Sequence, residues 1–130
     1  MEINHLAVIV AAISDLLVGA LWFSPLLFYR PWLKATGLRE ENLKGGQARV
    51  FGLTLLMALI ISYNLAAFLG EEGTDAAWGA TAGFLAGVWA AAGLVIIALF
   101  ERKNLTYILI NCGYLLIAFT LKGFIIGLWR

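Results

Sequence analysis

Long apolar runs separated by short polar stretches dominate the chain. Four runs reach the roughly 20 residues that a helix needs to cross the apolar core of a bilayer. They cover residues 5–24, 50–69, 76–100 and 105–129. Because a backbone in lipid has no water to bond with, each run must satisfy its own peptide groups and is predicted to be an α-helix. The runs do not alternate between apolar and polar residues, so membrane β-strands are not expected.

The polar stretches predict where the helices end. Pro25 lacks a backbone N–H group and is expected to end or kink the first helix. The segment 26–36 mixes aromatic and basic residues, as lipid headgroup regions do, with Pro31 opening a short interfacial helix and Gly37 ending it. We therefore predict an all-α fold, with residues 1–130 forming one membrane domain of four transmembrane helices and a short helix after the first.

Composition supports a membrane location. The 130 residues are 62% hydrophobic and only 13% charged, and a soluble fold of this size would leave much of that apolar surface in water. The net charge of +1 gives no reason to expect nucleic acid as a partner. A single cysteine, Cys112, and a single histidine, His5, exclude an internal disulfide and a multi-cysteine metal site. We expect no metal and no cofactor.

Charge placement predicts the orientation in the membrane. The acidic connection between the second and third runs has no base, whereas seven of the nine Lys and Arg residues lie in the other two connections. These seven are Arg30, Lys34, Arg39, Lys44, Arg49, Arg102 and Lys103, and the acids are Glu71, Glu72 and Asp75. Because basic connections stay in the cytoplasm, the loop of about residues 30–49 is predicted to be cytoplasmic and both termini to lie outside.

Two short motifs resemble those of a known family. The first is Gly-x-x-Trp-Phe-Ser-Pro, at Gly19, Trp22, Phe23, Ser24 and Pro25, and the second is Asn-x-Gly-Tyr, at Asn111, Gly113 and Tyr114. In this order the chain resembles, over nearly its whole length, the small bacterial membrane proteins grouped as domain of unknown function 1761. The resemblance implies the four-helix fold and the inner membrane of a bacterium, but no activity, cofactor or catalytic residue.

Two charged residues interrupt the apolar runs. Asp15 lies near the middle of the first helix and Lys122 lies in the last. A charge at the centre of a bilayer costs about 2.5–3.5 kcal/mol on insertion scales, so that it usually has a partner or a purpose. Asn111 lies on the same side of its helix as Lys122, and Asn64 lies near the outer end of the second helix. We expect these four side chains to form one polar seam inside the bundle.

Three interpretations of the seam are open. It can be an ion pair or hydrogen-bonded contact that holds helices together. It can be a site where Asp15 binds and releases a proton or a cation. In the third, Lys122 extends toward the membrane surface and leaves Asp15 protonated. The third helix carries glycines every fourth residue, Gly79, Gly83 and Gly87, which predict close packing either within the chain or between copies of it.

These features favour a structural or accessory membrane protein that associates with itself or with a larger membrane complex. The alternative is a small proton- or ion-coupled transporter, which would need an oligomer to enclose a pathway and would use Asp15 as its buried acid. A membrane enzyme is the least favoured class, because the sequence has neither a nucleophile with a matching base nor a set of metal ligands.

Overall fold

The computed structural model describes residues 3–70 and 73–129. Its helices are α1 (His5–Trp22), α2 (Tyr29–Thr36), the short 3₁₀ helix η1 (Glu40–Leu43), α3 (Gln47–Phe68), α4 (Ala76–Phe100) and α5 (Leu105–Leu128). The prediction of an all-α fold with four long apolar helices is confirmed, since α1, α3, α4 and α5 are long and apolar enough to cross a membrane. The described residues contain no strand.

Local signals in the sequence fix the ends of these helices. Asn4, Asp75 and Asn104 each accept a hydrogen bond from the backbone N–H three residues on, at 3.2, 2.8 and 2.9 Å, and so cap the N-termini of α1, α4 and α5. The first helix ends at Trp22, two residues before the predicted end, because the chain turns ahead of Pro25. Gly37 ends α2 as expected, with a left-handed φ of 76°.

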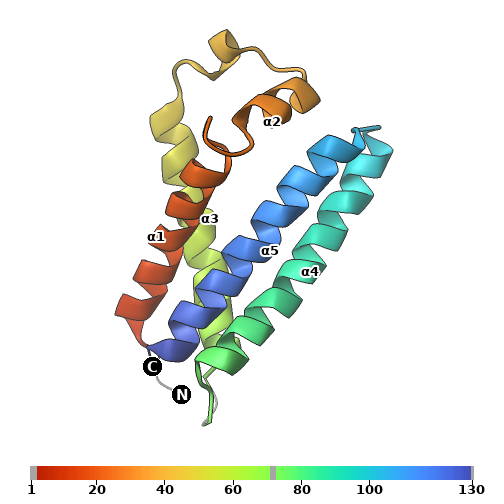
Figure 1. Cartoon of the computed structure of the whole chain (residues 1–130). Coiled ribbons are helices and arrows are strands. Elements are labelled where there is room, and N and C mark those ends of the chain that lie inside the picture. Colours follow the sequence, from red (N-terminus) through yellow and green to blue (C-terminus); the bar gives the residue numbers. More distant parts are fainter. Residues whose placement is uncertain (1–2, 71–72, 130) are drawn as a thin grey trace.

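The four long helices form a bundle in which α5 lies at the centre (Figure 1). Helix α4 packs mainly on α5, whereas α1 packs on both α3 and α5. Helix α2 and the connection between α4 and α5 lie at one end of the bundle, and both termini lie at the other (Figure 1). The two basic connections are therefore at the same end. Glu71 and Glu72 of the predicted acidic connection lie outside the described residues.

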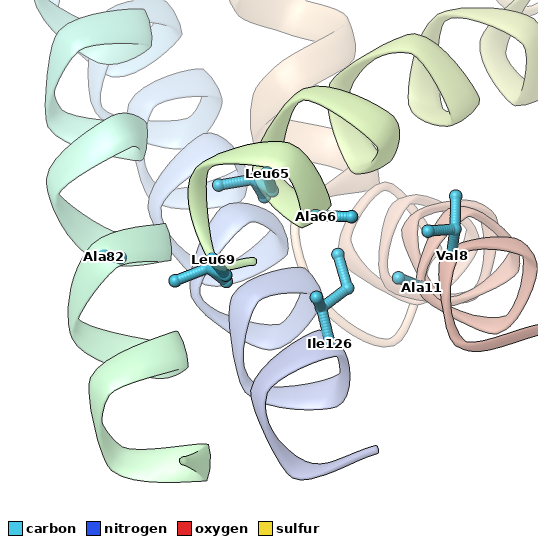
Figure 2. Packing of buried hydrophobic residues seen from close by; sticks show 7 residues of the cluster. All are labelled: Val8, Ala11, Leu65, Ala66, Leu69, Ala82 and Ile126. Atoms are coloured by element: carbon cyan, nitrogen blue, oxygen red, sulfur yellow. The ribbon is translucent and has the colours of Figure 1, made fainter. Parts of the chain in front are cut away.

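The buried core is built mainly from small side chains. Figure 2 shows one cluster of buried residues, which comes from all four long helices and consists of Val8, Ala11, Leu65, Ala66, Leu69, Ala82 and Ile126. Many large apolar side chains face outward instead, as Trp89 does with an exposed fraction of 80%. Because lipid tails are as apolar as leucine, bulky side chains gain little by turning inward, and helices associate through small residues that pack closely.

The glycine face of α4 packs against α5 within the same chain. A β-carbon at Gly79 would lie 2.9 Å from the α-carbon of Gly127 and closer still to the carbonyl of Gly123, and one at Gly83 would lie 3.2 Å from the α-carbon of Gly123. At Gly87 the nearest atom would be a side-chain carbon of α5 at 3.0 Å. These glycines allow the two backbones to touch. Of the two alternatives, the structure shows packing within the chain, with α5 covering this face.

Candidate functional site

A buried ion pair joins the first and last helices of the bundle. The amine of Lys122 on α5 donates to Oδ2 of Asp15 on α1. The hydroxyl of Tyr114, two turns earlier on α5, donates to the other carboxylate oxygen, Oδ1. Asp15 and Lys122 are both buried, and Lys122 has no exposed surface. Each oxygen of the Asp15 carboxylate therefore has a donor from α5.

The amine of Lys122 also lies close to an aromatic ring. Its amine lies 4.6 Å from the centroid of the Phe119 ring, one turn away on the same helix, where the ring face attracts a cation. The ammonium and the carboxylate neutralise each other, so that the bundle interior carries no net charge at this point. Removing either partner would leave the other as an isolated charge in an apolar region, which is far more costly than keeping the pair.

The residues of the two sequence motifs contact each other between α1 and α5. The Tyr114 ring lies 3.5 Å from the position that a β-carbon at Gly19 would take. In the reverse direction, the Trp22 ring lies 2.8 Å from the β-carbon position of Gly113, and the Trp22 indole N–H donates to the Ile110 carbonyl at 2.9 Å. On each helix a glycine thus leaves room for an aromatic side chain of the other helix. The two motifs therefore share the role of packing α1 against α5.

The remaining motif residues position α2. The Ser24 hydroxyl donates to the Leu21 carbonyl at 2.6 Å and stabilises the turn before Pro25. The Phe23 ring lies between two other aromatic rings, with centroids 5.4 Å from Tyr114 and 5.3 Å from Trp32 on α2. The end of α1, the start of α2 and the middle of α5 are therefore linked by one aromatic cluster next to the ion pair.

Asn64 lies away from the ion pair. Its side chain is exposed, and its amide donates to the Ile60 carbonyl of its own helix at 2.7 Å. Helix α3 packs inward through Ala58, Ser62, Leu65 and Ala66, and a step of two residues from Ser62 rotates the side chain by about 200°. The expectation that Asn64 joins a seam in the bundle interior therefore does not fit the structure.

Asn111 also lies apart from Asp15. It is on α5, but 11 residues from Lys122, or about 16 Å along the helix axis, and it lines a cavity next to α2 instead. The partner that the sequence reasoning missed is Tyr114, which belonged to the motif but not to the expected seam. A phenol in an apolar helix needs a hydrogen-bond partner, and this was the available signal.

Two cavities lie on either side of Tyr114. One, of about 250 Å³, is between α1, α3 and α5, and its mostly apolar wall includes Asp15, Tyr114 and Lys122. The other, of about 560 Å³, lies under α2, and Tyr114 forms part of its wall as well. Tyr114 and Leu115 therefore form part of both walls.

The remaining candidate residues, His5 and Cys112, contact neighbouring helices. The His5 Nδ1 atom and the Tyr63 hydroxyl share a hydrogen bond of 2.9 Å between α1 and α3. The Cys112 thiol donates to the Ala91 carbonyl at 3.7 Å across the interface of α4 and α5. Within the described ranges, no three His, Cys, Asp or Glu side chains are grouped so that they could hold a metal ion.

Comparison with known proteins gives one match. The sequence model of a family described as "protein of unknown function (DUF1761)" matches residues 6–127, which is nearly the whole chain. No curated protein and no solved structure matches the chain. Both motifs lie inside the matched range.

Proposed function

The chain belongs to the DUF1761 family of proteins of unknown function, and from this premise we propose that it is a structural or accessory membrane protein in which the buried ion pair holds the bundle together. The observation that carries the proposal is that both oxygens of the Asp15 carboxylate have a hydrogen-bond donor. Both of its oxygens accept hydrogen bonds from α5, and Lys122 has no exposed surface. A pair enclosed in this way suits a permanent contact between helices better than an exchange of ions.

A second feature supports association with another membrane protein or a second copy. The exposed Asn64 amide lies in an apolar groove of about 390 Å³ between α3 and α4, beside Trp78 and Trp89. Amides in lipid are favoured where they meet another helix, because hydrocarbon offers them no partner. The groove is separate from the glycine face of α4, which α5 covers. It is the surface on which we place a partner helix.

Native mass spectrometry after gentle extraction from the membrane tests this function. We expect either a homo-oligomer or an assembly of fixed ratio with a larger membrane protein. Asn64→Leu should weaken that assembly, whereas Thr106→Val, which changes an exposed polar side chain of α5 outside the groove, should not. A protein that is monomeric and without partners under these conditions would contradict an accessory role.

The alternative function is a small proton- or ion-coupled transporter that acts as an oligomer with Asp15 as its acid. It is favoured by the two neighbouring cavities, which share Tyr114 and Leu115 in their walls and one of which includes Asp15. Flux into liposomes driven by a proton gradient tests it. Asp15→Asn should abolish flux in a protein that still folds, and flux retained by that variant would exclude the transporter.

We also propose the location as the inner membrane of a bacterium, with both termini outside the cytoplasm. The support is the distribution of charge: both basic connections lie at the end of the bundle that carries α2 (Figure 1), opposite the termini. Basic connections are retained on the cytoplasmic side during insertion.

A further inference from the structure

The cavity under α2 has a wall that changes in polarity along its length. Helix α5 and the turn before it contribute a lysine, a phenol, an amide and an apolar side chain at four-residue spacing: Lys103, Tyr107, Asn111 and Leu115. The last three of these residues are in α5, where this spacing places them on one side and about 6 Å apart along the axis, and Lys103 lies in the turn before the helix. The wall is therefore basic at the end of the bundle, polar in the middle and apolar deeper in the membrane.

The basic end of the cavity has a charge without an acidic partner. Lys103 is half-buried, and its amine lies 5.4 Å from the centroid of the Tyr107 ring. In the part of the chain that the structure describes, the only ion pair joins Asp15 and Lys122, so Lys103 has no carboxylate beside it. An anion at this position would find an uncompensated positive charge next to the headgroup layer, where each Lys or Arg strengthens anionic lipid binding.

The middle of the cavity has an amide without a partner. Asn111 is half-buried about 6 Å deeper than Tyr107 along the helix axis. Its side chain makes no hydrogen bond to any residue in the ranges 3–70 and 73–129, although an amide has two donors and an acceptor to satisfy. Because an unpaired amide in an apolar region is costly, a polar group that enters the cavity would be stabilised here.

Helix α2 forms one side of the cavity and is held there by two contacts. The Phe23 and Trp32 rings pack at 5.3 Å between centroids, and the Asn104 amide donates to the Ala35 carbonyl at 3.2 Å. The space beneath is about 560 Å³, which is within the usual range of sites for small molecules. Three helices contribute to its wall, with Trp32 of α2, Leu94 of α4 and Asn111 of α5 around the same space.

We propose that this cavity binds an anionic amphiphile, a phospholipid with a negatively charged headgroup, with its phosphate at Lys103. The ester carbonyls would accept from the Asn111 amide, and an acyl chain would run along Leu94 and Leu115. The order of these groups in a phospholipid, from charge through ester to hydrocarbon, is the order of polarity along the cavity wall. This proposal stands apart from the accessory function, because the groove at Asn64 is a different surface.

Titration of the protein in phosphatidylcholine nanodiscs with dioleoyl phosphatidylglycerol, followed by native mass spectrometry, tests the proposal. We expect one phosphatidylglycerol molecule to be retained per chain. Lys103→Gln should weaken its binding about fivefold, as expected for one lysine near an anionic headgroup, without affecting retained phosphatidylcholine. Asn111→Leu should weaken both lipids, because both carry ester carbonyls. Leu94→Trp, which fills the apolar end, should also weaken both.

Two matched controls separate this site from general attraction to lipid. Arg102→Gln removes the neighbouring base, which does not line the cavity, and Asn64→Leu removes an amide from the groove of α3 and α4. Equal losses for Arg102→Gln and Lys103→Gln would overturn the proposal in favour of nonspecific charge. Displacement of the lipid by millimolar inorganic phosphate would overturn the amphiphile and point to a free phosphate. Unchanged binding in both Asn111→Leu and Leu94→Trp would place the lipid elsewhere.

Discussion

Trp22 of α1 lies directly across Gly113 of α5, with its ring 2.8 Å from the point where a β-carbon at residue 113 would be. Its indole N–H donates to the carbonyl of Ile110, one turn earlier on α5, at 2.9 Å. The flat ring can lie on the α5 backbone only because residue 113 has no side chain. This contact and the reciprocal one between Tyr114 and Gly19 hold α1 and α5 at the spacing in which Asp15 reaches Lys122.

Gly113→Ala should therefore destabilise the protein, by about 1–3 kcal/mol for a methyl group forced into a packed interface. Thermal unfolding in detergent or nanodiscs measures the change. Gly93→Ala on α4 is the matched control, because a β-carbon at that position meets no atom within 4 Å. Alanine favours a helix over glycine, so the control should be neutral or slightly stabilising. Equal losses in the two variants would mean that Trp22 does not press on Gly113.

Asp15→Asn and Lys122→Met should each destabilise the bundle strongly, by about 3–5 kcal/mol, because each leaves a buried charge without its partner. The double variant should lose less than the sum of the two single losses, with a coupling of about 1–3 kcal/mol. Unfolding of the four proteins in the same detergent completes the double-mutant cycle. Additive losses would show that the two side chains do not interact in the membrane.

Tyr114→Phe should lower the unfolding free energy by about 1–3 kcal/mol, because it leaves one oxygen of the Asp15 carboxylate without its donor. The ring would still pack over Gly19, so the α1–α5 spacing should persist. Tyr107→Phe is the control. It removes a phenol hydroxyl from the same helix, at a residue that lines the cavity under α2, and it should have little effect on stability. Unfolding curves that shift equally for both variants would argue against the bond to Asp15.

The proposed orientation predicts which connections a membrane-impermeant thiol reagent reaches in intact cells. With Cys112 replaced by alanine, Thr74→Cys between α3 and α4 should be labelled from outside, whereas Lys44→Cys between η1 and α3 should not. Both should be labelled after the cells are opened. Labelling of Lys44→Cys alone in intact cells would reverse the orientation, and the cavity under α2 would then face the outer leaflet.

The sequence by itself determined that this protein consists of helices, and local signals set several of their ends. In lipid, an apolar run of about 20 residues has no alternative to helix, and the caps Asn4, Asp75 and Asn104 act on their own neighbours in the chain. The glycine spacing on α4 likewise indicated a close backbone approach, whichever helix was to make it. These are local properties, or properties of the solvent, and they need no knowledge of the other helices.

Only the tertiary structure decided which side of each helix faces inward. In water the apolar side of a helix marks the core, but here both sides are apolar, so the rotation of a helix is set by contacts between small residues and aromatic rings of different helices. For this reason Asn64 was expected in the interior but lies on the surface, and Tyr114 had no assigned partner until α5 was placed against Asp15. The partner of the α4 glycines was likewise decided only by the tertiary structure, which places α5 of the same chain against them.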